Sequence, residues 1–217
     1  MITIVCVLRV GGKVGYDATW VDKLYNMVKR NTTVPFKFVC LTDVPIDHDR
    51  ISLLSIGSGY WAKMQLFRSG LFVGPTLYLD LDTVIAGSLD PIIEKLMAQH
   101  KFVMWRDPDY NISSSAIMYW SGDQSYIFNT YLQYTDYFEN LYSQENQGAE
   151  RQVGDQALIS RVTDHVFIND MVPAEWIQVL GKNTSDNLDQ CRILIFRKNN
   201  NKPSNKLEHP LVKEHWH

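Results

Sequence analysis

The sequence is poor in the features that mark several large classes of protein. Its longest apolar runs, Ile2 to Leu8 and Ala116 to Trp120, fall far short of the ~20 residues that a helix needs to cross a bilayer. Lysine and arginine number 21 against 24 aspartates and glutamates, so a net charge of −3 gives no general footprint for nucleic acid. We therefore expect neither a membrane span nor a nucleic-acid partner.

Cysteine is also scarce, because the chain has only three, Cys6, Cys40 and Cys191, and no C-x-x-C pair. An odd number of cysteines, two of them inside apolar runs, predicts buried free thiols in a reducing compartment. The first residues carry no basic segment and no small-residue cleavage site, so they do not read as a signal peptide. We expect a cytoplasmic protein.

What remains is typical of a globular chain, with 45% hydrophobic and 21% charged residues over 217 positions. The apolar run at 2–8, the helical spacing at 16–30 and the apolar run at 36–41 predict a strand–helix–strand unit, the start of a parallel sheet. Further strands are expected at 51–56, 76–79, 102–105, 116–120 and 193–196, and helices at 61–71, 89–99, 125–142 and 156–162. The pattern predicts one α/β domain with a mostly parallel central sheet and flanking helices.

The strongest chemical signal is Asp80-Leu81-Asp82, which directly follows the apolar strand at 76–79. In an extended segment, residues i and i+2 point the same way, so both carboxylates would converge at the carboxyl end of a strand. Two neighbouring carboxylates repel each other unless a cation lies between them. A hard divalent ion that also binds a diphosphate would fit, although a solvated turn gives the same pattern.

The longer string from Leu77 to Ile85, followed by Leu89-Asp90-Pro91, resembles the nucleotide-sugar glycosyltransferases of the GT-A fold. It is most similar to the retaining family 8 type, the glycogenin and lipopolysaccharide galactosyltransferase kind, and resembles the small family 8-like enzymes found in bacteria and their phages. The resemblance implies a single Rossmann-like GT-A domain over 1–217. In that scheme 1–105 is the nucleotide-binding half, 106–196 the acceptor-side half and 197–217 a C-terminal tail.

The same resemblance assigns donor-binding roles around the first strand and the 61–71 helix. Trp61-Ala62-Lys63 matches the family's helix whose basic residue reaches the donor sugar and diphosphate, although Lys63 could instead face solvent. Leu8 and Arg9 end the first strand, and Arg9 could reach phosphate or base. Tyr16 matches the tyrosine that stacks on uracil in the family, or else it packs on the core.

Two later segments complete the expected site. Ser114 and Ser115 precede an apolar strand in a segment that usually lies beside the donor sugar, with Ser114 where the family has asparagine. Gly154-Asp155-Gln156 resembles the family's G-D-Q loop. The resemblance implies that Asp155 binds sugar hydroxyls and that Gln156 lies near the reacting carbon, while a helix N-cap is the structural alternative for Asp155. The implied catalytic residues are Asp155, Gln156 and Lys63.

The tail departs from the family pattern. The family has a metal-binding histidine where this chain has Arg197, which cannot ligate a metal, whereas Lys202-Pro203 is retained. Three explanations stay open for the third metal ligand. In the first, diphosphate and water complete the coordination sphere of a metal ion held by Asp80 and Asp82. In the second, a C-terminal histidine (His209, His215 or His217) is the third ligand. In the third, Arg197 and Lys202 supply part of the positive charge that the metal would otherwise provide.

The implied activity is transfer of a hexose from UDP-glucose or UDP-galactose to an acceptor hydroxyl with retention of configuration. Mn²⁺ or Mg²⁺ would be held by Asp80 and Asp82. The implied donor-binding residues are Leu8, Arg9, Tyr16, Lys63, Asp80, Leu81, Asp82, Ser114, Ser115 and Lys202. A protein that binds sugar nucleotides without turnover, and a nucleotidyltransferase, are the alternatives. The second lacks support because the chain has no G-x-G-x-x-G loop.

Overall fold

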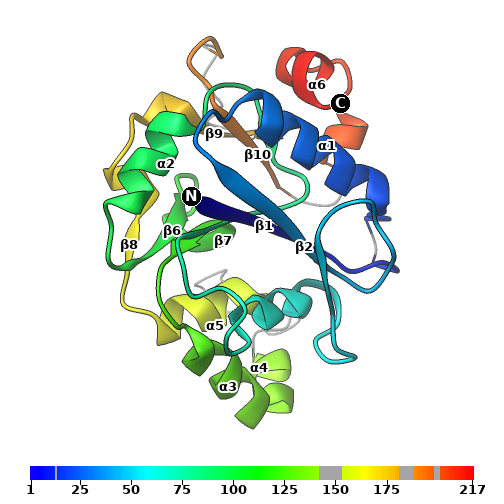
Figure 1. Ribbon diagram of the computed structural model, residues 1–217, viewed down its shortest axis with the longest axis vertical. Helices are drawn as coiled ribbons and strands as arrows, with labels where there is room; N and C mark the ends of the chain where they lie inside the picture. The colour runs from blue at the N-terminus through cyan, green and yellow to red at the C-terminus, as the bar shows by residue number, and fades with distance from the viewer. Residues whose placement is uncertain (13, 142–152, 181–187, 198–200) are drawn as a thin grey trace.

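The computed structural model describes residues 1–12, 14–141, 153–180, 188–197 and 201–217. Its centre is a seven-stranded sheet with the order β3-β2-β1-β4-β7-β6-β8. Helices cover both faces of this sheet, as Figure 1 shows with α1 and α6 on one side and α3, α4 and α5 on the other. The predicted α/β class is confirmed.

The sheet is parallel through its first four strands and mixed beyond them. Strands β3 (Arg50–Ser52), β2 (Phe36–Thr42), β1 (Ile2–Leu8) and β4 (Thr76–Leu79) run in parallel. Strand β7 (Ile112–Trp120) is antiparallel to both β4 and β6 (Phe102–Asp107), and β8 (His165–Phe167) is parallel to β6. Because parallel strands end at the same edge, the segments that follow β1 and β4 lie together there.

One face of the sheet packs against α1 (Ala18–Arg30), α2 (Asp90–Met97) and α6 (Pro210–His215). Helix α1 begins where the Asp17 carboxylate accepts a hydrogen bond of 2.9 Å from the Thr19 amide, which satisfies one free donor of the first turn. Its buried residues follow the predicted 3.6-residue period: Trp20, Val21, Leu24, Met27 and Val28.

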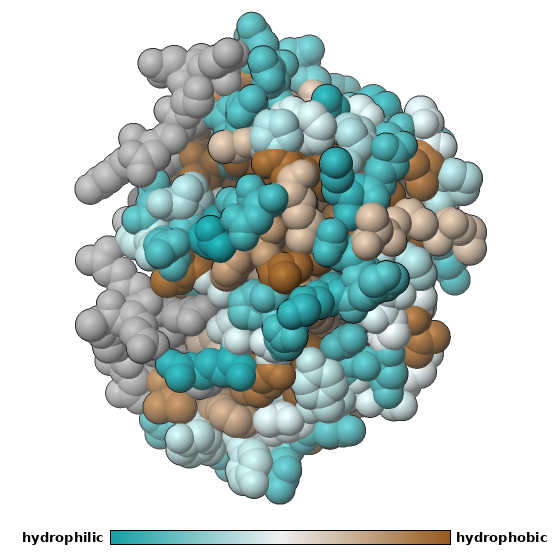
Figure 2. All heavy atoms as spheres, turned by 90° about the vertical axis from the view of Figure 1, so that its left-hand side faces the viewer, coloured by the Kyte–Doolittle hydropathy of each residue, from teal (hydrophilic) through white to brown (hydrophobic). Residues whose placement is uncertain are grey.

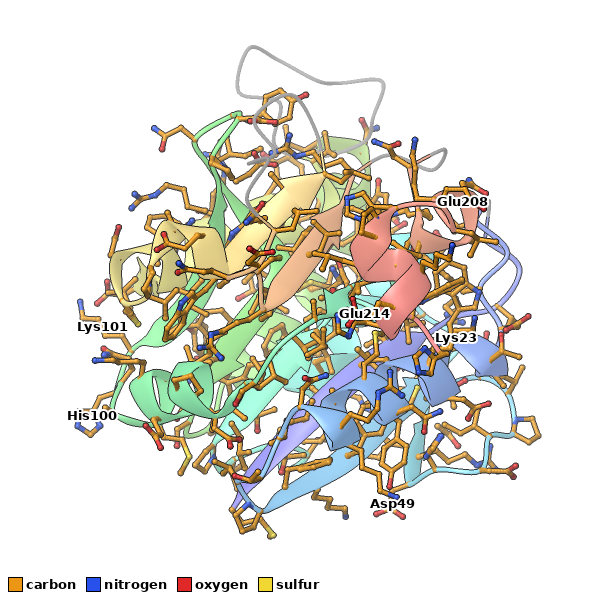
Figure 3. All side chains as sticks on the ribbon, turned by 90° about the horizontal axis from the view of Figure 1, so that it is seen from above. Lys23, Asp49, His100, Lys101, Glu208 and Glu214 are labelled. Atoms are coloured by element: carbon orange, nitrogen blue, oxygen red, sulfur yellow. The ribbon has the colours of Figure 1, made fainter. Side chains whose placement is uncertain are left out.

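The same face also carries a small second sheet of order β5-β10-β9, formed by β5 (Val84–Ile85), β10 (Ile193–Phe196) and β9 (Ile177–Leu180). Strand β10 is antiparallel to β5, which follows Asp82 by two residues. The end of β10 therefore runs back toward the acidic motif, and the C-terminal tail starts beside it. Figure 3 shows α6 lying along α1, with Glu214 and Lys23 marking the two helices.

The opposite face packs against the 3₁₀ segment η1 (Gly59–Phe67), α3 (Ser125–Gln133) and α5 (Gly154–Val162). Helix α4 (Thr135–Leu141) follows α3 and buries none of its residues. Short 3₁₀ turns complete the description: η3 (Ile168–Asp170), η4 (Ala174–Trp176) and η5 (Pro203–Asn205). On the side shown in Figure 2, hydrophilic residues cover most of the face and apolar ones are scattered among them.

Several predicted elements differ in extent or type, and the strand expected at 116–120, for example, begins at Ile112. The strand expected at 51–56 stops at Ser52, because the carbonyls of Leu54 and Ile56 accept hydrogen bonds from the Gln65 amide group, at 3.1 and 2.7 Å. The 61–71 helix is η1 instead, a 3₁₀ segment ending at Phe67. Every residue from Trp61 to Phe67 is buried, so this stretch has no solvent-exposed face and its sequence shows no amphipathic helical period.

The helix predicted at 125–142 is two helices in the described part, because the backbone leaves helical geometry at Tyr134 (φ −137°). Tyr131 is buried and stacks on Trp61, whereas Tyr126, Tyr134 and Tyr137 are exposed. Tyr142, the last member of this tyrosine-rich segment, lies outside the described residues. The three cysteines are free and buried, as predicted.

Candidate active site

The acidic motif forms a turn at the end of β4. The Asp80 amide donates to the Ala116 carbonyl of β7 at 3.0 Å, and the Thr83 amide donates back to the Asp80 carbonyl at 3.1 Å. The sequence predicted an extended segment here, and that prediction was wrong. The segment is a turn, closed by a backbone hydrogen bond across four residues. The result is that Asp80 and Asp82 contact different cations.

The Asp80 carboxylate belongs to a buried charge network around Lys63. The Lys63 ammonium lies 3.0 Å from Asp80 Oδ1 and 3.1 Å from Asp155 Oδ2, and it donates to Ser115 Oγ at 2.9 Å. The Ser115 hydroxyl in turn donates to Asp155 Oδ2 at 2.6 Å. The solvent-facing alternative for Lys63 is thus excluded, since only 10% of its side chain is exposed.

Burial and charge oppose each other at Lys63. Desolvation lowers the pKa of the ammonium, but Asp155 and Asp80 raise it by more, so the pKa lies above that of an ordinary lysine. Lys63 is therefore a permanent cation that joins η1, β4 and α5.

Tyr78, the third residue of β4, is a neighbour that the sequence reasoning missed. Its hydroxyl donates to Asp80 Oδ1 at 2.5 Å, and burial first, then the Asp80 charge, raises its pKa well above the usual value. Tyr78 stays protonated and fixes the orientation of the Asp80 carboxylate. The signal in the sequence is its position in β4, two residues before Asp80, which directly follows the strand.

The Asp82 carboxylate has a separate set of partners from the first loop and from the tail. The Tyr16 hydroxyl donates to Asp82 Oδ2 at 2.7 Å, and the Lys202 ammonium pairs with the same oxygen. The Tyr16 ring packs edge-on against Trp20 with centroids 4.8 Å apart. Burial, then the Asp82 charge, raises the pKa of Tyr16, so it remains a donor. The structure brings Tyr16, Asp82 and Lys202 together.

Asp155 reaches Lys63 because of the way α5 begins. The N-cap is Val153, so the prediction that Asp155 could cap this helix was wrong, and its carboxylate is free to turn toward Lys63 and Ser115. Gly154 has φ +67° and lies so close to Tyr60 that an added Cβ would be 2.5 Å from the ring. A side chain at 154 would disturb both the turn and the Tyr60 contact.

The remaining predicted donor residues occupy different positions. Leu8 and Leu81 are buried in the core, so only their backbones can face a ligand. Arg9 donates to the carbonyls of Leu54 and Ile56, at 2.8 and 3.1 Å, and thereby organises the loop after β3. Ser114 is half-buried and accepts from the Ala116 amide at 3.3 Å. Gln156 is half-buried in the first turn of α5.

Arg197 is engaged in a cluster that the sequence reasoning did not single out. Its guanidinium pairs with the carboxylates of Asp107 and Asp109, and its Nε donates to Asp107 Oδ2 at 2.7 Å. The side chains of both aspartates are only 10% exposed, at the end of β6 and in the turn after it. In these contacts the Arg197 charge is shared between two carboxylates near the β6–β7 turn, whereas Lys202, the other residue expected to supply positive charge, pairs with Asp82. Asp107-Pro108-Asp109 repeats the D-x-D pattern after a strand, which was the available signal.

The site residues fit a divalent ion, but only as a partial ligand set. Three carboxylates (Asp80, Asp82 and Asp155) face two ammonium groups, so a diphosphate would add negative charge to a site that is already negative. The hydrogen bonds from Tyr78 and Tyr16 go to Oδ1 of Asp80 and to Oδ2 of Asp82, respectively. Carboxylate oxygens of this kind are suitable ligands for Mn²⁺ or Mg²⁺. Within the described ranges no group of three or more His, Cys, Asp or Glu residues is placed to hold a metal ion.

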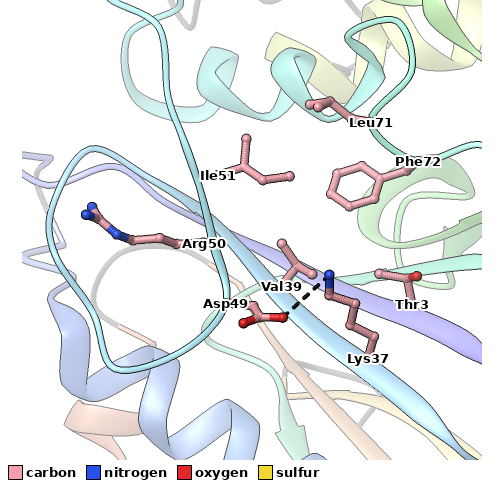
Figure 4. A pocket seen from close by; sticks show the side chains of 8 residues that line it. All are labelled: Thr3, Lys37, Val39, Asp49, Arg50, Ile51, Leu71 and Phe72. Carbon is pink, nitrogen blue, oxygen red and sulfur yellow. Dashed lines mark ion pairs between the residues drawn. The ribbon is translucent and has the colours of Figure 1, made fainter.

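A separate hollow of about 320 Å³ lies away from this cluster, at the beginning of β1, β2 and β3 (Figure 4). Its lining includes the exposed ion pair between Lys37 and Asp49, with the charged atoms 3.5 Å apart. Since Asp80 and Asp82 follow the end of β4, this hollow is not part of the candidate site.

Comparison with solved structures identifies the fold as that of the GT-A glycosyltransferases. The galactosyltransferase LgtC, in complex with donor and acceptor sugar analogs, aligns with a TM-score of 0.60 over 93% of this chain and 88% of its own, at 11% identity. The glycosyltransferase GlyE of Streptococcus pneumoniae TIGR4 aligns with a TM-score of 0.59 over 95% of this chain and 57% of its own, at 13% identity. No protein-family model and no curated protein matches the sequence. None of the helices in the described ranges combines the length and apolarity of a membrane-crossing segment.

Proposed function

We propose that the protein is a glycosyltransferase that moves a hexose from a UDP-sugar, UDP-glucose or UDP-galactose, to an acceptor hydroxyl with retention of configuration. The observation that carries this proposal is the convergence of Asp80, Lys63 and Asp155 with Asp82 and Lys202 at the carboxyl end of β4. The same fold is used by LgtC, whose structure holds donor and acceptor sugar analogs.

Each residue has a role that follows from its position. Lys63 is a permanent ammonium beside Asp80, so it can bind the diphosphate and stabilise the charge that develops when the bond to the sugar breaks. Asp155 is held by Lys63 and Ser115, which fixes its carboxylate as an acceptor for sugar hydroxyls. Gln156, on the same turn, would lie near the reacting carbon, and Tyr16 would lie beside the uracil.

Asp80 and Asp82 would hold Mn²⁺ or Mg²⁺, which supplies Lewis-acid stabilisation of the leaving diphosphate. The ion would need further oxygen ligands from the diphosphate and water, because the two carboxylates leave most of ~6 positions open. We therefore expect nucleotide and metal to bind cooperatively. The acceptor is a glycan or another hydroxyl compound, for which the exposed tyrosines of α3 and α4 offer one surface.

A panel of UDP-, GDP- and ADP-sugars with Mn²⁺, read as release of the free nucleoside diphosphate, tests the proposal. We expect release from a UDP-hexose above the rates with GDP- and ADP-sugars, and its loss in Asp82→Asn. Lys213→Ala, which removes an exposed lysine of α6, is the matched control and should keep the wild-type rate. Binding of UDP without release would favour a sugar-nucleotide-binding protein, the alternative that Arg197 in the histidine position supports.

A further inference from the structure

The C-terminal tail is fastened at both of its ends. At its start, β10 delivers Arg197 to the two largely buried carboxylates of Asp107 and Asp109. At its end, Trp216 of the α6 cap packs edge-on against Trp20 of α1, with ring centroids 5.0 Å apart. The Arg30 guanidinium adds hydrogen bonds of 2.6 and 3.0 Å to the last carbonyls, those of His215 and His217. Figure 3 shows α6 and α1 side by side.

Between these two anchors, Lys202 pairs with Asp82. Only five peptide units separate Arg197 from Lys202, so the backbone of Lys202 must stay within about 17 Å of the Arg197 anchor. Both partners of the ion pair are largely buried, with 12% of the Lys202 side chain and 7% of the Asp82 side chain exposed. A buried ammonium on a carboxylate that faces a cation site competes directly with any other cation for that carboxylate.

We propose that Arg197 is a positioning residue: clamped by Asp107 and Asp109, it places the Lys202 ammonium at the cation position of Asp82, where the ammonium stands in for a divalent ion until metal and nucleotide arrive together. This proposal rests on the proposed function for the metal and nucleotide that would displace Lys202 from Asp82. The pairing of Arg197 with Asp107 and Asp109, and the competition between Lys202 and a cation for Asp82, can be tested without any sugar transfer. It accounts for the loss of a histidine ligand at 197, because an arginine there secures a built-in cation instead.

The geometry explains why arginine is needed at this place. A guanidinium is a planar fork that pairs with two carboxylates at once, and here it meets both Asp107 and Asp109. A lysine would offer one compact charge and would hold only part of the cluster. The Arg197 guanidinium also lies over the Tyr110 ring, 5.0 Å from its centroid, in the turn that carries Asp109. The clamp thus binds the tail to the β6–β7 turn, on the strand pair beside β4.

The test measures Mn²⁺ binding by electron paramagnetic resonance without nucleotide, so it needs no turnover. Lys202→Ala should tighten Mn²⁺ binding by about tenfold or more, because Mn²⁺ no longer has to displace the Lys202 ammonium from the Asp82 carboxylate. Arg197→Gln should tighten it as well, by no more than Lys202→Ala does. Lys213→Ala, the exposed control on α6, should leave Mn²⁺ affinity unchanged.

The double variant separates positioning from a merely structural role. If Arg197 acts through Lys202, adding Arg197→Gln to Lys202→Ala produces no further change in Mn²⁺ affinity. Should Arg197→Gln fail to fold, because it leaves two largely buried carboxylates without this partner, the neutral cluster Asp107→Asn/Asp109→Asn/Arg197→Gln replaces it. Additive effects in the cycle, or a Lys202→Ala protein whose Mn²⁺ affinity is unchanged or weaker, overturn the proposal.

A second readout distinguishes this proposal from the proposed function. With saturating Mn²⁺, Lys202→Ala should bind UDP more weakly than wild type by calorimetry. In wild type the ammonium that leaves Asp82 can pair with the phosphate, and the variant lacks this ammonium. The substitution should therefore tighten Mn²⁺ binding without nucleotide and weaken UDP binding with Mn²⁺ present. These opposite changes in affinity are expected if Lys202 pairs with Asp82 in the free protein and with the phosphate in the complex. If wild-type protein binds no UDP at all, the proposed function fails, while the Mn²⁺ cycle still decides the role of Arg197.

Discussion

Replacing Lys63 by methionine removes a cation shared by Asp80 and Asp155 while keeping an unbranched side chain of similar length. The Asp155 side chain is only 6% exposed, and among the described residues its carboxylate contacts Lys63 and Ser115, so without Lys63 it becomes a buried charge that lacks this ion-pair partner. Breaking a buried ion pair by removing one partner costs about 3–5 kcal/mol. Asp80 adds less, because 29% of its side chain is exposed and water can solvate it.

For a chain of this length, that loss corresponds to a fall in melting temperature of roughly 6–20 °C. Thermal and urea unfolding followed by circular dichroism measure it. The matched control is Lys101→Met, because Lys101 pairs with Asp164 at a similar distance, 2.9 Å, but both side chains are more than half exposed. That variant should lose at most about 1 kcal/mol.

The double variant Lys63→Met/Asp155→Asn should recover a large part of the loss, because it removes the buried carboxylate that lacked its ion-pair partner. The pH dependence follows from the raised pKa of Lys63. Its contribution is complete below the unfolded pKa of about 10.4 and is lost as the pH rises through the folded pKa, so the gap between wild type and Lys63→Met stays constant near neutral pH and shrinks in strong alkali. A Lys63→Met protein that melts within about 2 °C of wild type at pH 7 would refute the buried network.

Three further outcomes are expected. Excess chelator should abolish release of UDP from a UDP-sugar, as should Asp82→Asn; a full rate in chelator would contradict the metal assignment. Tyr16→Ala should weaken UDP binding, and wild type should prefer UDP to GDP and ADP by calorimetry; equal affinity for the three nucleotides would count against a base-binding role. Gly154→Ala should destabilise the fold by about 1–3 kcal/mol, because φ is +67° and the new Cβ meets the Tyr60 ring; an unchanged urea midpoint would refute that contact.

Several parts of the molecule follow from local sequence alone. Strands β1, β2, β4 and β10 are short apolar runs bounded by polar residues, and α1 has an apolar stripe with an Asp17 cap, so each is set by its own residues. The acidic pair at 80 and 82 was visible because it directly follows β4. Its placement at the carboxyl end of a parallel strand needed no knowledge of distant contacts.

Other elements depend on contacts between distant parts of the chain. Segment η1 is buried between the sheet and α3, so no amphipathic period announces its 3₁₀ geometry. Strand β8 has only three residues, and β5 only two, so both exist through their partners rather than through propensity. The turn that separates Asp80 from Asp82 is closed by a backbone bond that a spacing rule for extended chain does not foresee.

The residue types of the candidate site were determined by the sequence, but their pairing was decided by the tertiary structure. Lys63 meets Asp155 across 92 positions of the chain and Lys202 meets Asp82 across 120 positions, and no local pattern encodes either pair. The resemblance placed Arg197 where the family has a histidine ligand, and the fold turns it toward Asp107 and Asp109. The physical reason is that a charge buried in a folded core must find an opposite charge, and only the packed arrangement of strands and tail fixes which one lies within reach.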